Sequence, residues 1–205
     1  MKDCLVKMLG TMLTILTITA NANDSGDNIY SDQNSLLLGI GMGYNTPYGL
    51  GVQVGYRKSN SYDINAGMGV NFSGKKTGVG FRVFLSPIKR ITPYLGLNYV
   101  HSEGQKVFVT RNSVSVVEVR GGELVPMDGQ AFYNIPSGDI VHFRAGMIFS
   151  RKSWMDLVAS FGYAYPLGDN EPIYVSGDTD SKIREQAEWA SAGGLEISGE
   201  ILFKF

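Results

Sequence analysis

The chain has little cysteine, little charge and no long apolar run, and each shortage excludes a class of protein. Among its 205 residues the one cysteine, Cys4, has no second cysteine with which to form a disulfide. Charged residues make up 18% at a net charge of -1, so no basic surface for nucleic acid is indicated. Threonines interrupt the longest uncharged stretch near an end, residues 8–23, which falls short of the roughly 18 apolar residues of a helical membrane span.

Glycine and aromatic residues are abundant instead, with 26 Gly, 11 Tyr, 10 Phe and 2 Trp. This composition is too aromatic and too weakly charged for a disordered chain, and the length suits a single domain. The mean hydropathy of -0.03 is that of an ordinary soluble protein. A membrane β-barrel gives the same average, however, because apolar and polar residues alternate along each of its strands.

The first 22 residues predict a signal peptide that is removed. Lys2 and Lys7 form a basic start, residues 8–18 an apolar core, and Ala20-Asn21-Ala22 a small-x-small cleavage site. Cys4 would leave with this segment, so the mature chain would hold no thiol for catalysis or for a disulfide. An exported chain without a helical anchor belongs in the periplasm, the outer membrane or the medium.

The mature chain alternates with a period of two, which is typical of β-strands. In residues 36–44, apolar side chains from Leu36 to Tyr44 share one face and glycines occupy most of the other. The pattern recurs at 50–57, 62–72, 78–85, 94–99, 141–149, 155–165 and 189–205. Strands of about 9–11 residues cross a bilayer at a tilt. We therefore predict an all-β fold, an eight-stranded antiparallel transmembrane β-barrel.

Two features favour a membrane barrel over a soluble sheet. The less apolar face is made of Gly, Asn, Ser and scattered charges, which suits a narrow lumen. Aromatic residues of the apolar face gather near the strand ends, as in the two interfacial girdles of membrane barrels. The predicted girdle comprises Tyr44, Tyr56, Tyr62, Phe72, Tyr99, Phe149, Tyr165 and Trp189.

The charges on the inward face have both signs and must pair to offset their desolvation. We expect Arg82 and Arg144 to engage Glu196 and Glu200 across the lumen. The predicted lumen polar network comprises Arg82, Arg144, Glu196, Glu200, Asp63 and His142. A structural plug is the favoured interpretation, because a barrel of this size has room only for side chains, and an ion path is the alternative. No metal site and no cofactor are predicted.

The ending Gly194–Phe205 alternates up to a terminal aromatic residue. Together with the signal peptide and the strands, it resembles the small bacterial outer-membrane β-barrels of the OmpA/OmpX-like superfamily, although Glu200 stands where a penultimate glycine would be expected. The resemblance implies an outer-membrane location, contact with outer-membrane lipid and lipopolysaccharide, and recognition of Phe203 and Phe205 by the barrel-assembly machinery. The predicted organisation is a cleaved signal peptide at 1–22, a short periplasmic segment at 23–34, and a barrel domain at 35–205.

The resemblance also places Phe205 on the periplasmic side. Short basic turns at 57–61, 86–92 and 150–153 then become periplasmic, and 45–49, 73–77, about 102–139 and about 166–188 become outer loops. We expect residues 106–119 to project above the membrane as a hairpin. The alternative is two further wall strands, which would make ten.

The expected function is that of a non-enzymatic barrel whose two long outer loops, 102–139 and 166–188, serve surface interaction, adhesion or envelope integrity, with a host or surface ligand there. A small-solute or hydrophobic-molecule channel, porin-like in kind, is one alternative. A lipid A-modifying enzyme is another, since His101-Ser102-Glu103 is similar to the His-x-Ser pair of lipid A deacylases of the PagL kind. Adjacent residues of a strand point to opposite faces, however, so Ser102 is poorly placed to transfer a proton to His101.

Overall fold

A computed structural model describes residues 34–58, 61–86, 90–110, 114–116, 130–178, 180–191 and 193–205. The predicted signal peptide at 1–22 lies outside these residues, as does the predicted periplasmic segment except for its last residue. Within the described ranges, no helix combines the length and the apolarity needed to cross a bilayer.

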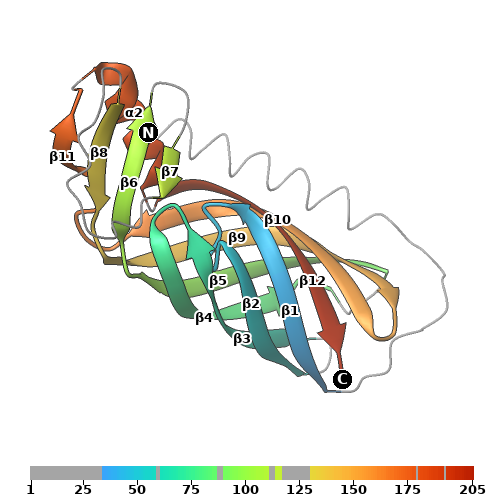
Figure 1. The fold of residues 1–205 in the computed structure, drawn as a ribbon. Coiled ribbons are helices and arrows are strands. Elements are labelled where there is room, and N and C mark those ends of the chain that lie inside the picture. Colours follow the sequence, from blue (N-terminus) through green and yellow to red (C-terminus); the bar gives the residue numbers. More distant parts are fainter. Residues whose placement is uncertain are drawn as a thin grey trace, which may run out of the picture.

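Eight strands of the described chain close into an antiparallel barrel (Figure 1). Their order around the wall is β1-β12-β10-β9-β5-β4-β3-β2, so each strand pairs with the preceding and following wall strands, and the first pairs with the last. The strands are β1 (Ser35–Tyr44), β2 (Leu50–Lys58), β3 (Tyr62–Asn71), β4 (Gly74–Phe84), β5 (Ile91–Ser102), β9 (Gly138–Lys152), β10 (Met155–Pro166) and β12 (Gly194–Lys204). The predicted eight-stranded barrel is confirmed.

The period of two in the sequence becomes an inside and an outside of the wall. In β1, Leu36 and Ile40 point outward and are 62% and 52% exposed, whereas Leu37 between them is 4% exposed. The register keeps the faces aligned across strands, because Ile40 lies opposite Val52 of β2 on one side and Ile201 of β12 on the other. The exposed face of the barrel is therefore apolar, whereas its interior holds the buried charged side chains beside an apolar cluster of Phe84, Tyr94, Ile148, Val158 and Leu202.

The barrel has two unlike ends. The terminal end holds the start of β1 and the end of β12, where the backbone N–H of Phe205 donates to Leu36 O at 3.0 Å. The distal end holds the turn at 45–49 and the tight turn at 72–73. The chain also leaves the distal end between β5 and β9, and again between β10 and β12.

These two excursions fold together into a distal subdomain, visible beyond the barrel mouth in Figure 1. It contains β6 (Gln105–Thr110), β7 (Val114–Val116), β8 (Gln130–Ile135), β11 (Ile173–Gly177) and the helix α2 (Ser181–Ala190). The four strands form one sheet in the order β11-β8-β6-β7. Helix α2 packs on this sheet through Ile183, Ala187 and Ala190, and the side chain of Asp180 caps its first turn by accepting from Lys182 N.

The placement of β6 and β7 decides between the two interpretations of residues 106–119. Both strands belong to the distal sheet and pair with each other, so they lie outside the barrel wall and the ten-stranded alternative is wrong. Their position above the membrane stays a prediction. Residues 117–119 lie outside the described ranges.

Several predicted boundaries are wrong, two of them by four or five residues. Residues 74–77 were expected in an outer turn, but they form the start of β4. The turn between β3 and β4 consists of residues 72 and 73 alone, and Gly74 directly after it adopts a positive φ of 108°. Trp189, expected to start the last strand, lies in α2, and β12 begins at Gly194. Ile183, Ala187 and Ala190 lie on one buried face of the helix, at a spacing of four and then three residues. In a segment of ten residues with few apolar side chains, this spacing is too weak a pattern to predict a helix.

Candidate functional site

Two aromatic belts surround the outside of the barrel, one near each end. The terminal belt contains Tyr56, Tyr62, Phe149 and Phe203, to which the structure adds Trp154, stacked on Phe203 with ring centroids 6.1 Å apart. The distal belt contains Tyr44, Phe72, Tyr99, Tyr165 and Trp189. Trp189 reaches this belt from α2, because its ring lies 5.8 Å from that of Tyr44 and its carbonyl accepts from the Tyr44 hydroxyl.

A continuous chain of ion pairs fills the lumen from the terminal end to the distal half. At the terminal end, Asp156 accepts from Lys204 Nζ and from Arg57 Nη1, each at 2.7 Å. Arg57 Nη2 also lies 3.4 Å from Asp63 Oδ2, and Asp63 Oδ1 accepts from Arg82 Nε at 2.7 Å. The side chains of these five residues are 9% exposed or less.

Glu200 sits at the centre of the chain, between two guanidinium groups. It accepts from Arg82 Nη1 at 3.0 Å, from Arg144 Nη2, and from Gln53 Nε2 at 2.9 Å. Arg144 Nε lies 2.8 Å from Glu196, whose second oxygen is 2.9 Å from His142 Nδ1. The six residues of the predicted lumen network thus lie in one connected set, which also contains Arg57, Asp156 and Lys204.

The charged groups of the lumen are paired with one another and flanked by aromatic rings. Ionic side chains removed from water are tolerated only when their partners are in place, and here each carboxylate of the chain contacts at least two cationic groups or side-chain donors. Aromatic rings flank two of these cations. The ring centroid of Phe84 lies 5.1 Å from Arg57 Cζ, and the ring centroid of Tyr94 lies 5.8 Å from Arg82 Cζ. This arrangement favours a structural plug over an aqueous path.

The turn between β1 and β2 folds into the distal mouth of the barrel. All of its residues, 45–49, are buried, and Asn45 and Gly49 adopt positive φ angles of 53° and 62° that direct the chain inward. The buried ammonium group of Lys76 donates to Thr46 O at 3.1 Å. Asn45 holds the turn against the entry to β12, where its side chain donates to the carbonyl of Gly193 and accepts from Gly193 N at 3.3 Å.

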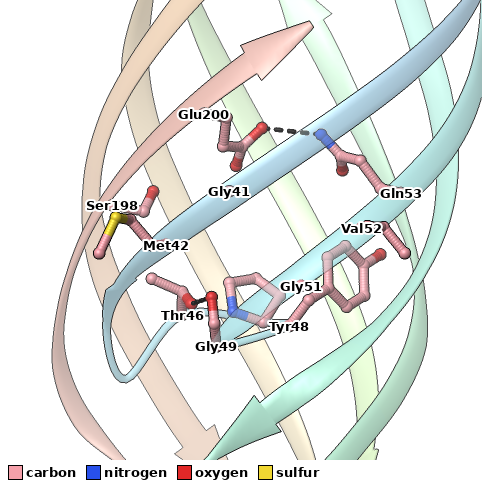
Figure 2. A pocket seen from close by; sticks show the side chains of 11 residues that line it. Gly41, Met42, Thr46, Tyr48, Gly49, Gly51, Val52, Gln53, Ser198 and Glu200 are labelled. Atoms are coloured by element: carbon pink, nitrogen blue, oxygen red, sulfur yellow. Dashed lines mark hydrogen bonds between the residues drawn. The ribbon is translucent and has the colours of Figure 1, made fainter.

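Residues 45–49 are called the plug turn, and their Tyr48 lines a pocket together with Val52 and Gln53 (Figure 2). The Tyr48 hydroxyl donates to Asn65 Oδ1 at 2.9 Å. Gly67 makes room for the ring, because a Cβ there would lie 2.7 Å from Tyr48 Cε2. Between the plug turn and Gln53, Ser198 and Glu200 remains a cavity of about 20 Å³, room for roughly one water molecule.

The distal subdomain has a hydrophobic core of its own. Val107, Val109, Ala131, Tyr133 and Ile135 of the sheet are buried against Ile183, Ala187 and Ala190 of α2. This core involves both long loops predicted from the sequence, although neither was expected to fold with the other. The two loops therefore form one packed unit rather than two independent loops.

The structure separates the residues of the deacylase-like motif. His101 is exposed on the outer face of β5, with Nδ1 2.8 Å from Asp139 Oδ1. Ser102 is buried, and its hydroxyl donates to Ser73 O at 2.8 Å. The two side chains lie on opposite faces of the wall, as the strand geometry requires, so no His–Ser pair exists in the described chain. No group of three or more potential metal ligands is found there either.

Several residues inside the barrel were not among the six of the predicted lumen network. Gln53, Asn65 and Asn98 are buried inside the barrel, and their alternation with apolar residues carried the signal that would have identified them. Tyr48 and Lys76 carried no such signal. Both fall in segments interpreted as outer turns, and an inward-folded turn leaves no trace in strand periodicity.

No family model matches this chain, and no curated protein matches it. Among solved structures, the chain is similar to the N-terminal β-barrel domain of Pseudomonas aeruginosa OprF, at 11% identity over 85% of this chain and 98% of that one, with a TM-score of 0.48. It is also similar to Neisserial surface protein A (NspA), at 14% identity over 84% of this chain and 96% of that one, with a TM-score of 0.43. The barrel expected from the OmpA/OmpX-like resemblance is confirmed by the closed strand order of the chain itself.

Proposed function

We propose that this protein is an integral, non-enzymatic outer-membrane β-barrel with a closed lumen, which holds its distal subdomain at the cell surface as an interaction module. The observation that carries the proposal is the reversal of polarity across the wall. Charged side chains such as Arg82 and Asp63 are 1% and 0% exposed, whereas Met68 and Ile197 are 59% and 67% exposed. An apolar surface of this extent needs lipid to cover it.

The aromatic belts support the same environment. Tyr and Trp side chains concentrate where hydrocarbon meets the lipid headgroups, and the two belts lie near the two ends of the strands. The distal belt would then contact lipopolysaccharide, and the terminal belt would lie at the periplasmic leaflet. In this orientation Phe203 and Phe205 lie at the periplasmic end, where the assembly machinery would bind the last strand.

The filled lumen favours a module held at the surface over a channel. The ion-pair chain and the plug turn leave a cavity of about one water molecule in the distal half. In planar bilayers we expect no steady openings above the lipid background. Stepwise conductance from the purified barrel, absent from a preparation in which the barrel has been boiled, would contradict the closed lumen.

The distal subdomain provides the surface function. A sheet and a helix with a shared core present a fixed surface, whereas two unstructured loops would lose conformational entropy on binding. An epitope tag inserted at Gly168, which is exposed between β10 and β11, tests its location. We expect antibody to bind this tag on intact cells and to bind the same tag at Ser153, in the turn between β9 and β10, only after permeabilisation. The opposite result would reverse the proposed orientation.

The enzyme alternative has its own test. The proposal expects an unchanged lipid A profile in cells that express His101→Ala or Ser102→Ala, measured by mass spectrometry against cells with the parent protein. A change in acylation with His101→Ala alone, at equal barrel abundance, would make the exposed His101–Asp139 pair a catalytic candidate.

A further inference from the structure

The distal sheet ends in an edge strand with an unusual surface. In the order β11-β8-β6-β7, β11 pairs with β8 on one side, and no described strand pairs with its other side. Its residues Ile173, Tyr174 and Val175 are consecutive and are 56%, 44% and 49% exposed. Lysine and proline commonly protect edge strands; Pro172 stands immediately before β11, and Ile173–Gly177 itself contains neither residue type.

The edge is also held in place. The Tyr174 ring packs against Tyr133 of β8 at 5.8 Å, and its hydroxyl donates to Gly177 O at 2.7 Å. The register with β8 shifts between Tyr174 and Ser176, so Val175 is a bulged residue without a partner on β8. A bulge of this kind redirects a side chain, here toward solvent. The strand is therefore a fixed edge that needs little ordering before another strand adds to it.

Acidic residues lie on both sides of this apolar strand. Asp169 and Glu171 precede it and are exposed, whereas Asp178 and Asp180 follow it and are half-buried. Asp169, Asp178 and Asp180 each accept one backbone N–H through Oδ1, so a cationic partner would bind carboxylates that are already held in place. Glu171 and Asp178 are seven positions apart, which spans about 23 Å of extended chain. A second copy of this chain paired antiparallel at the edge would bring these carboxylates against each other, and like charges facing across strands are unfavourable. The flanks instead complement a partner with cationic residues.

We propose that β11 is a docking edge that adds one extended polypeptide strand, with an apolar, β-branched centre and Lys or Arg on each side. Main-chain hydrogen bonds to the open edge would supply affinity, and contacts with Ile173 and Val175 together with the acidic flanks would supply specificity. This inference rests on the proposed function, because the partner reaches β11 only if the distal subdomain is exposed at the cell surface.

Binding of a short peptide to the full-length protein, folded in zwitterionic micelles, tests the proposal. The probe has a Val-Thr-Val-Thr-Val centre with two lysines at each end, and the control peptide has glutamates in place of the lysines. We expect the lysine peptide to bind at least about tenfold more tightly at low salt, and to protect the amides of 173–176 from hydrogen exchange. The amides of 114–116 in β7, the opposite edge, should gain no protection when the peptide is added.

Ile173→Lys should weaken the lysine peptide by about tenfold or more, since it removes an apolar contact and adds repulsion. Ser115→Lys is the matched control, because it adds the same charge to an exposed position of β7 and should leave binding unchanged. Three results would overturn the proposal that β11 is a docking edge. These are equal binding of the lysine and glutamate peptides, equal effects of Ile173→Lys and Ser115→Lys on binding, and hydrogen-exchange protection outside 173–176. A gel shift between boiled and unboiled protein is recorded on each sample, so failure of the barrel itself is recognised separately.

Discussion

Replacing Glu200 by glutamine tests whether the buried ion-pair chain holds the barrel together. Glu200→Gln keeps the shape of the side chain and removes the charge that faces Arg82 at 3.0 Å and Arg144 beside it. Both guanidinium groups are almost fully buried, so neither can turn to water in compensation. The substitution therefore leaves an excess of positive charge inside the wall.

The expected cost follows from the partners that remain. Removing one member of a buried ion pair destabilises a protein by about 3–5 kcal/mol. Arg82 keeps Asp63 at 2.7 Å, Arg144 keeps Glu196 at 2.8 Å, and the glutamine oxygen still accepts a hydrogen bond. We therefore expect the lower end of the range, about 3 kcal/mol. The measurement is urea unfolding of the barrel in lipid vesicles, followed by tryptophan fluorescence and by gel migration without boiling.

Glu188→Gln is the matched control. It removes the same carboxylate from an ion pair, but Glu188 and Arg184 are 54% and 66% exposed on α2, so the loss should stay below about 0.5 kcal/mol. A second comparison joins Glu200→Met with Arg144→Met, and the double variant should lose less than the sum of the two single variants. Equal losses from Glu200→Gln and Glu188→Gln would refute the argument that desolvated charge makes the lumen network essential.

Three further outcomes are expected. Gly67→Ala places a Cβ against the Tyr48 ring and should lower the free energy of unfolding by about 1–3 kcal/mol in the same assay. The control is Gly199→Ala, which has nothing within 4 Å of the new carbon and should change this free energy by less than about 0.5 kcal/mol. Equal effects of the two substitutions would contradict the inward plug turn. Ile183→Asp puts a charge into the distal core and should make the distal subdomain sensitive to limited proteolysis while the barrel keeps its heat-modifiable migration, and a uniformly resistant protein would contradict a separate core. Deleting Phe205 should lower the amount of assembled barrel in outer-membrane fractions, and normal assembly would count against the terminal signal.

The barrel was predictable because its information is local. Alternation along 36–44 or 155–165 fixes which side chains point outward from the wall, and closure follows from the number and length of such segments. The lumen partners were predictable for a related reason. Arg82, Arg144 and Glu200 share the inward face, and a narrow interior leaves charged groups no choice except one another.

The plug turn and the distal subdomain were not predictable in the same way. Tyr48 folds inward because Gly67 on a neighbouring strand leaves space for its ring, a contact between residues that periodicity does not connect. Helix α2 is stabilised by strands of the other loop, so the role of its few apolar residues becomes clear only once Val107 and Tyr133 are placed beneath them. The edge strand β11 likewise acquires its exposed side only through its pairing with β8.

The central claim is that the chain is a folded barrel in the outer membrane, and heat-modifiable migration of protein extracted from separated membrane fractions tests it most directly. We predict that the protein sediments with the outer membrane, migrates faster than its mature mass when unboiled, and shifts to its full mass after boiling. A protein found in the soluble fraction, with the same migration before and after boiling, would contradict the account.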